Sequence, residues 1–170
     1  MSRRIPVTDP NNPNAPYFAI VDDSNYEWLN QFKWCRTTNS GLYRHTIYAV
    51  RSVAPPGESK LMHKMITNYK RTDHANGIGL DNRRENLRET TQSQNQANSQ
   101  ATLSYGGKPT SSKYKGVKKD STTGRWMVQV FKEGKQYWVG RFVNEEEAAR
   151  AYDTKAKELF GEFARLNFPT

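Results

Sequence analysis

Four polar residues in the middle of the chain have the types and spacing that phosphodiester hydrolysis requires. Asp73 and His74 are adjacent, Asn86 lies twelve residues after His74, and Asn95 lies nine residues further on. Hydrolysis needs a hard cation to stabilise the charge that develops on the phosphate, and magnesium prefers carboxylate and amide oxygens. It also needs a base that accepts a proton near neutral pH, a role that suits histidine. Asp73 and Asn95 are therefore candidate metal ligands, His74 is a candidate base, and Asn86 could fix either the histidine or the loop.

Each of these residues also has an ordinary structural explanation, so types and spacing alone leave both interpretations open. Asp-His is a common turn dipeptide, and asparagines such as Asn86 and Asn95 are frequent on protein surfaces. The chemical interpretation needs a particular arrangement, because adjacent residues on a strand point to opposite faces. His74 would face the water while Asp73 holds the metal if the strand ends in a twist or bulge.

The elements expected around these residues follow the order strand, loop, strand, helix. Asp73 and His74 end a short extended run, Asn76-Gly77 is a tight-turn dipeptide, and the polar stretch around Asn95 is typical of a short helix. Upstream, the apolar pattern predicts a modest platform on which these elements can rest. Its expected members are strands at 17–21 and 45–53, a helix capped by 22–24 and a short helix at 60–69, after a disordered tail over 1–16.

Three motifs in this region resemble the HNH endonucleases, or ββα-metal nucleases, and in particular the phage homing-endonuclease branch, whose third motif residue is asparagine. The motifs are LMHKMI (61–66), DHANGIGLDNRRENLR (73–88) and QSQNQAN (92–98). Together with the upstream leader, the resemblance covers about 17–98. It implies a homing-type DNA endonuclease that hydrolyses phosphodiester bonds to 5′-phosphate and 3′-hydroxyl ends.

The resemblance also implies a role for each motif residue. Asp73 and Asn95 would hold one divalent metal ion, which would polarise the phosphate and stabilise the leaving 3′ oxygen. His74 would be the general base that takes a proton from the attacking water, and Asn86 would orient it. Because the third motif position is asparagine rather than histidine, magnesium is the expected cofactor, with manganese as an alternative and zinc disfavoured.

Four more residues near the motif have an expected part in the site. His63, in the LMHKMI segment, is expected to be structural or supporting rather than the base. Arg83, Arg84 and Arg88 are expected to bind DNA phosphates near the cut, and ordinary surface charge is the alternative explanation for them.

Composition restricts the class of protein. The chain has 170 residues, of which 26 are Lys or Arg and 17 are Asp or Glu, and its formal net charge is +9. Nucleic acid is therefore the first candidate partner, and the alternative is a basic surface that only maintains solubility. The excess charge is concentrated over 113–142, which holds eight basic and two acidic residues. A single cysteine excludes an internal disulfide framework and a cysteine-rich zinc site.

Targeting and membrane signals are missing from the sequence as it stands. No segment approaches the roughly 18 apolar residues of a membrane span, and the N-terminal segment turns polar where a signal peptide would have its apolar core. We therefore expect an intracellular, cytoplasmic protein, in the host cell's cytoplasm if a phage encodes it. The expected partner is double-stranded DNA, with no membrane and no small-molecule substrate, and the chain is expected to be a monomer.

A polar segment at 99–112 carries one charge, two glycines and a proline, a composition typical of a linker. It divides the chain into an HNH endonuclease module over 1–98, with its motif core at 60–98, and a DNA-binding module over 113–170. The predicted fold class is α+β, with a ββα-metal HNH nuclease module and a small three-stranded antiparallel sheet packed on one helix.

The second module shows regular alternation followed by helical spacing. Strands are expected at 114–119, 125–131 and 136–142, and a helix is expected between Asn144 and Gly161. A sheet this narrow has one face free and can enter the major groove. The residues expected on the free face are Lys115, Lys118, Arg125, Gln129, Gln136 and Trp138. A solvated polar face is the alternative.

Five segments of this module resemble the apetala-two/ethylene-response-factor DNA-binding domain over about 114–169. They are YKGVKK, GRWMVQV, YWVGRF, EEEAARAYDTKAKELFG and ARLNFP. The resemblance implies that the sheet reads the major groove. The implied groove-facing residues are Lys115, Lys118, Gln129, Gln136 and Trp138, and Arg125 is the implied backbone contact. The chain departs from the family where lysines of the first strand, Phe131 and Gln136 replace arginines and Gln129 replaces a glutamate. Fewer arginines predict weaker guanine readout.

The sequence thus predicts an HNH endonuclease that a C-terminal sheet-type domain brings to DNA. One alternative is a non-catalytic, sequence-specific DNA-binding regulator with a degenerate nuclease module. Another is a non-specific nuclease toxin, which would degrade any DNA.

Overall fold

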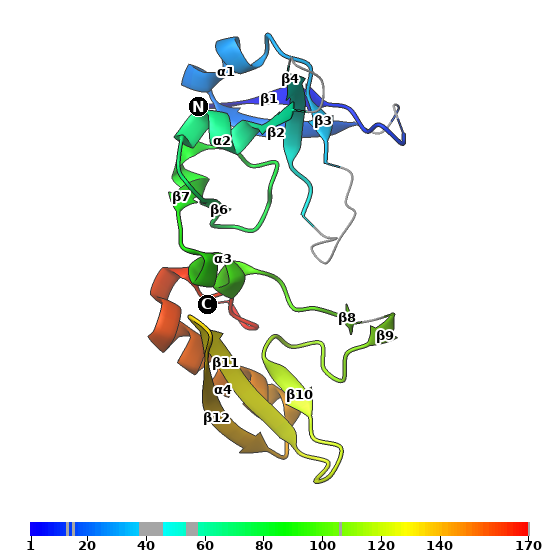
Figure 1. Cartoon of the computed structure of the whole chain (residues 1–170), viewed down its shortest axis with the longest axis vertical. Coiled ribbons are helices and arrows are strands. Elements are labelled where there is room, and N and C mark those ends of the chain that lie inside the picture. Colours follow the sequence, from blue (N-terminus) through cyan, green and yellow to red (C-terminus); the bar gives the residue numbers. More distant parts are fainter. Residues whose placement is uncertain (13, 15, 38–45, 54–57, 106, 170) are drawn as a thin grey trace. The chain divides into compact units, whose positions relative to one another are not determined.

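The computed structural model describes residues 1–12, 14, 16–37, 46–53, 58–105 and 107–169 of the chain, which divides into two compact units (Figure 1). The first unit is Met1–Thr90 and the second is Thr91–Thr170. The boundary lies eight residues before the predicted end of the first module, so helix α3 (Gln92–Asn98) belongs to the second unit. The reason is packing, because the buried Ala97 is part of the second unit's apolar core.

In its described residues, the first unit is built from short elements and three antiparallel sheets. Its elements are β1 (Ser2–Val7), β2 (Tyr17–Asp22), α1 (Asp23–Leu29), β3 (Cys35–Arg36), β4 (Ala49–Val53), β5 (Glu58–Leu61), α2 (Met62–Thr67), β6 (Thr72–His74), the 3-10 helix η1 (Arg84–Asn86) and β7 (Leu87–Glu89). The sheets are β1-β2, β3-β4-β5 and β6-β7. Helix α1 contacts β1 and β2, and α2 contacts β4 and β5.

The N-terminal segment is ordered where the sequence predicted a disordered tail. β1 pairs with β2, and the side chains of Ile5 and Val7 are almost completely buried. Burial of two β-branched side chains, together with pairing to β2, outweighs the cost of ordering this polar segment. The same core contains other apolar residues of the unit, namely Ala19, Val21, Leu29, Trp34, Ala49 and Met62.

The strand that carries the motif residues forms as predicted. β6 pairs antiparallel with β7, so Asp73 lies opposite Arg88 and His74 lies opposite Leu87. The predicted order of strand, loop, strand and helix is therefore present along the chain. The assignment of these elements to a ββα-metal nuclease remains a prediction. A strand was predicted over 45–53, and β4 covers Ala49–Val53 of it. Residue 45 lies outside the described residues.

The second unit contains the predicted sheet and helix. Besides α3, its elements are β8 (Ser104–Tyr105), β9 (Lys108–Pro109), β10 (Val117–Lys119), β11 (Trp126–Lys132), β12 (Lys135–Phe142), α4 (Glu145–Phe160) and the 3-10 helix η2 (Gly161–Phe163). β10, β11 and β12 form an antiparallel sheet, and α4 packs on one of its faces (Figure 1). The side-chain oxygen of Asn144 accepts hydrogen bonds from the amides of Glu146 and Glu147 and so caps α4. The predicted three-stranded sheet on one helix is confirmed.

The segment predicted to be a linker is part of the second unit. β8 and β9 pair antiparallel, and Ser112 is buried. The hydroxyl of Ser112 donates to Glu145 at 2.7 Å and accepts from the amide of Tyr114 at 3.0 Å. Small polar residues of this segment therefore have fixed hydrogen-bond partners. Composition does not predict this, because a flexible linker contains the same types of residue. Among the described residues, no helix has the length and apolar character that crossing a membrane requires.

Candidate functional site

Asp73 and His74 are both buried at the end of β6, with exposed fractions of 6% and 4%. The Oδ2 atom of Asp73 accepts hydrogen bonds from Nε and Nη2 of Arg88, at 3.0 and 2.8 Å. Register explains this pair, because residues directly opposite in an antiparallel ladder share a face of the sheet. Arg88 was predicted to bind DNA phosphates, but the structure places its guanidinium on the candidate metal ligand.

The ring of His74 is part of a cluster of three buried or half-buried rings. Its centroid lies 5.0 Å from that of His63 and 5.5 Å from that of Tyr48. Burial lowers the pKa of His74, although the hydrogen bond with Asn82 and the charge of Asp73 oppose the shift. Burial, with the neighbouring His74, lowers the pKa of His63 to about 3. Both imidazoles are therefore neutral near pH 7.

Asn82 contacts the candidate base. It is completely buried, and its Oδ1 lies 3.4 Å from Nε2 of His74. An acceptor at this position favours the tautomer that carries its proton on Nε2, which leaves Nδ1 as the basic nitrogen. The resemblance implies that Asn86 orients this ring, whereas the asparagine that contacts the ring in the structure is Asn82.

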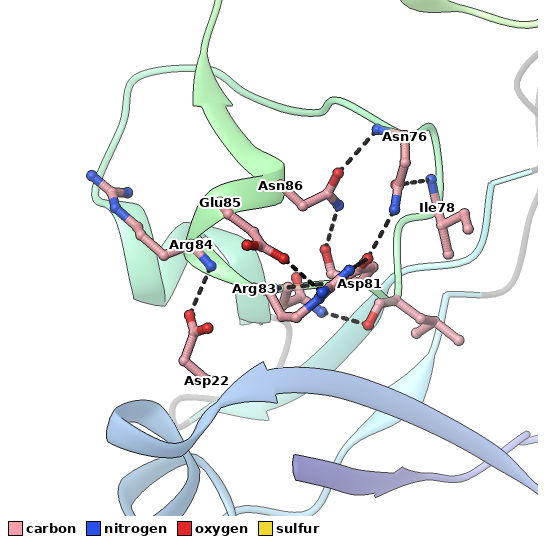
Figure 2. Close-up of polar contacts among 10 residues, drawn as sticks. Asp22, Asn76, Ile78, Asp81, Arg83, Arg84, Glu85 and Asn86 are labelled. Atoms are coloured by element: carbon pink, nitrogen blue, oxygen red, sulfur yellow. Dashed lines mark hydrogen bonds and ion pairs between the residues drawn. The ribbon is translucent and has the colours of Figure 1, made fainter. Parts of the chain in front are cut away.

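Asn86 holds the loop that follows His74. Its Nδ2 donates to the carbonyl of Asp81 at 2.7 Å, and its Oδ1 accepts from the amide of Asn76 at 3.0 Å. Figure 2 shows these two bonds on either side of the Asn86 side chain. The backbone of the same residue accepts from the amide of Ala75 at 2.9 Å. Asn86 therefore acts on the backbone of the loop.

The other two predicted phosphate-binding arginines also have partners within the first unit. Arg83 donates from Nε and Nη2 to the two carboxylate oxygens of Asp81, at 2.9 and 2.8 Å, and from Nη1 to Glu85 at 2.6 Å (Figure 2). This pairing lowers the pKa of Asp81. The guanidinium of Arg84 is exposed and donates to the hydroxyl of Tyr69 at 2.5 Å. Of the three, Arg84 is the exposed one, and Arg83 and Arg88 are half-buried.

Of the two candidate metal ligands, Asp73 is the one that lies in the first unit with His74. Among the residues that the structure describes, no group of three or more His, Cys, Asp or Glu side chains is placed to hold a metal. Magnesium commonly takes one or two protein carboxylates and completes its shell with water and phosphate oxygens. A buried carboxylate is suited to this, and it would have to share its charge with Arg88. Asn95 is a residue of α3 in the second unit, so its role as a ligand remains a prediction.

The free face of the β10-β11-β12 sheet is defined by its register. Gln129 pairs with Trp138, Phe131 pairs with Gln136, and Met127 pairs with both Lys118 and Arg141. We call these seven residues the open sheet face: Lys118, Met127, Gln129, Phe131, Gln136, Trp138 and Arg141. Four of the residues predicted for the free face, Lys118, Gln129, Gln136 and Trp138, belong to it. Arg125 is exposed and precedes β11.

Lys115 is used inside the second unit. Its ammonium donates to the carbonyls of Gln96, Ala97 and Ser99. The carbonyls at the C-terminal end of a helix have no partners within it, and a cation there stabilises the helix. Lys115 was predicted to face the DNA groove, whereas the structure places its side chain at the end of α3.

Three residues of the site and of the open sheet face were not predicted from the sequence, each for a different reason. Asn82 lies within the DNRREN segment, but nothing in the spacing distinguishes it from Asn86. Tyr48 is far from the motif along the chain. Arg141 lies three residues after Trp138, a spacing that normally puts two residues on opposite faces. A register shift between Val128 and Gln129 brings both onto the open sheet face.

Comparison with known proteins supports the DNA-binding prediction for the second unit. Residues 112–162 match the AP2 domain family. A 59-residue stretch is 46% identical to an AP2/ERF and B3 domain-containing protein of Oryza sativa subsp. japonica, covering 35% of this chain and 16% of that protein. A 48-residue stretch is 44% identical to dehydration-responsive element-binding protein 2A of Arabidopsis thaliana, covering 27% of this chain and 14% of that protein. The predicted apetala-two/ethylene-response-factor-like DNA-binding domain is confirmed.

A relative of another kind supports the nuclease prediction in part. The chain is 39% identical over 95 residues to an uncharacterized HNH endonuclease of Acanthamoeba polyphaga mimivirus. The match covers 56% of this chain and 46% of the viral protein. This chain spans between 14% and 46% of the length of these three relatives.

Proposed function

We propose that this protein is a metal-dependent DNA endonuclease of the HNH type that its AP2 domain brings to double-stranded DNA. The observation that carries the proposal is the buried Asp73-His74 pair, in which a carboxylate is adjacent to an imidazole that burial keeps neutral. The similarity to a viral HNH endonuclease supports the same reaction class. An adjacent carboxylate and neutral imidazole are what hydrolysis of a phosphodiester needs from the protein.

His74 would act as the general base. Its Nε2 lies beside the Asn82 amide oxygen, so the ring is oriented and its tautomer is selected. In that tautomer Nδ1 accepts a proton from the attacking water. Asn86 supports the step indirectly, because it holds the loop over Asn76–Asp81 that also leads to Asn82.

Asp73 would hold the divalent cation, with magnesium expected and manganese as the alternative. When bound, such an ion supplies charge stabilisation for the phosphate and the leaving 3′ oxygen. Arg88 balances the charge of the Asp73 carboxylate when the cation is absent. Asn95 is the second predicted ligand, and its substitution tests that role separately.

The second unit would supply affinity for DNA. Its segment 113–142 holds eight basic and two acidic residues, and phosphate neutralisation by such cations drives binding through counterion release. Because both units are parts of one chain, binding by the AP2 domain would raise the effective concentration of DNA at the nuclease unit.

A non-catalytic DNA-binding regulator is the second candidate function, and the AP2 match favours it, because that match concerns DNA binding alone. Supercoiled plasmid separates the two candidates. With magnesium, the wild type is expected to nick or linearise the plasmid, whereas His74→Ala and Asp73→Asn are expected to bind DNA as tightly as the wild type without cutting it. Nicks that DNA ligase reseals without prior phosphorylation would show 5′-phosphate and 3′-hydroxyl ends.

The outcomes of this experiment are distinct. Tight binding without cleavage in magnesium or manganese would establish the regulator. Cleavage that His74→Ala retains would remove His74 from the mechanism. Degradation of every DNA sequence without preferred ends would point to the non-specific nuclease.

A further inference from the structure

The open sheet face has amide and apolar side chains where a guanine-reading surface would carry arginine. Gln129 and Trp138 are directly opposite each other, and Phe131 and Gln136 form the next row. The side chains of Phe131 and Trp138 are 57% and 50% exposed, which is unusual for large apolar residues. These two rows contain no charged residue.

The two glutamines are joined to each other. Nε2 of Gln136 donates to Oε1 of Gln129 at 2.7 Å across the strands. This bond restrains the Gln129 amide, so part of the rotamer entropy is lost before any ligand binds. An amide oxygen has two lone pairs and an amide nitrogen has two hydrogens, so Gln129 keeps one acceptor site and its donors on the same planar group.

A planar amide with a donor beside an acceptor is complementary to adenine. In the major groove, adenine presents the N7 acceptor next to the N6 donor, whereas guanine presents two acceptors and requires two donors. The arginine of the open sheet face has other contacts, because Arg141 Nε lies 3.3 Å from Asp120 and its guanidinium lies over the Trp138 ring. The exposed aromatic rings match the other partner of the pair, because the thymine methyl group is the apolar feature of the major groove.

We propose that the open sheet face recognises A·T base pairs, with Gln129 reading adenine, Gln136 orienting Gln129, and Phe131 and Trp138 contacting thymine methyl groups. This inference rests on the DNA-binding part of the proposed function. Lys118, exposed at the end of the same face, supplies a phosphate contact that carries no sequence information. Charge complementarity favours DNA as the occupant of this face, because both of its charged residues, Lys118 and Arg141, are basic.

Duplexes selected from a random library by the full-length protein in EDTA, which prevents cleavage, test the proposal. The selected site is expected to contain A·T pairs. Within that site, replacing one adenine by 7-deazaadenine removes the N7 acceptor, and replacing thymine by uracil removes the methyl group. Loss of the adenine contact is expected to weaken binding roughly 5- to 150-fold. The same 7-deazaadenine probe should not affect binding by Gln129→Ala.

Three variants complete the test. Gln129→Arg is expected to shift the preference at one position from adenine to guanine. Gln136→Ala is expected to reduce discrimination against 7-deazaadenine while leaving the salt dependence of binding unchanged, which a phosphate-binding residue would not do. Gln92→Ala, at an exposed glutamine of the same unit, is the matched control and should behave as the wild type.

The failures can be told apart. Salt-dependent binding with a G·C preference, or with no base preference, would overturn the A·T inference and leave DNA binding intact. Absence of duplex binding at low salt would overturn both this inference and the targeting role in the proposed function, and the exposed aromatic rings would then indicate a protein partner.

Discussion

The imidazole rings of His63 and His74 meet edge to face, with their centroids 5.0 Å apart. His63 comes from α2 and His74 from β6, so this contact joins two elements of the first unit. Both rings are buried, and the pKa of His63 is lowered to about 3. A proton on either ring would place a charge in a poorly hydrated site beside another titratable ring, so the arrangement requires both to remain neutral.

Acid is therefore expected to destabilise the first unit. In the unfolded chain His63 has a pKa of about 6.5, and in the folded chain its pKa is about 3. The unfolded state thus binds the extra proton. The contribution of His63 to stability is therefore constant above about pH 6.5 and falls as the pH decreases from there toward 3. His63→Gln removes this titration. Its urea-unfolding free energy should fall less steeply between pH 6.5 and 4.5, by up to about 1.4 kcal/mol per pH unit. Parallel pH profiles for the two proteins would contradict this.

Asn86→Ala is expected to destabilise the first unit by about 2–3 kcal/mol, because it leaves a buried carbonyl and a backbone amide without their partners. Urea unfolding measures the loss. Asn30→Ala, at an exposed asparagine, should change the free energy of unfolding by less than about 0.5 kcal/mol. Equal effects of the two variants would show that the loop does not depend on the Asn86 side chain.

Arg88→Gln is expected to strengthen binding of a divalent cation. The guanidinium occupies Oδ2 of Asp73, and its positive charge opposes a cation at the same carboxylate. Titration of the metal-free protein with manganese at pH 7.5 should show an affinity roughly tenfold higher than that of the wild type. Asp73→Asn should bind manganese poorly whether or not Arg88 is present. Unchanged affinity in Arg88→Gln would indicate that metal and arginine do not share this carboxylate.

Gly116→Ala is expected to destabilise the second unit by several kcal/mol. Gly116 has a φ of +73°, and a Cβ atom there would overlap Cδ2 and Cε2 of Tyr152, a buried residue of α4. Gly124→Ala and Gly134→Ala are matched controls, because both have positive φ but no atom within 4 Å of an added Cβ. The controls should lose only about 1 kcal/mol. Thermal unfolding of the three variants would refute the clash if all of them lost the same stability.

Lys115 and Lys118 are expected to differ in their effect on DNA binding. Lys115→Gln should lower the stability of α3, because its ammonium is bound to the carbonyls at the end of that helix. It should leave the salt dependence of DNA affinity nearly unchanged. Lys118→Gln, at an exposed lysine, should reduce the slope of log affinity against log salt by about 0.9. Similar slope changes in the two variants would show that Lys115 contacts DNA as Lys118 does.

Local patterns determined much of the second unit. Alternation in β11 places Trp126, Val128 and Val130 toward the core, because the period of two is a property of the strand itself. Asn144 caps α4 because a side-chain oxygen at that position can reach the first free amides of any helix. The order of strand, loop, strand and helix around Asp73 was likewise predicted from the sequence.

Tertiary structure alone decided which of these residues meet. Whether Asn82 or Asn86 contacts His74 depends on the path of a loop, and both asparagines are chemically suited to it. The pairing of Asp73 with Arg88 depends on the register between two strands separated by that loop. Arg141 joins the open sheet face because one bulge reverses the alternation of β12. Such contacts are set by packing between segments distant along the chain, whereas capping and alternation depend on neighbours a few residues away.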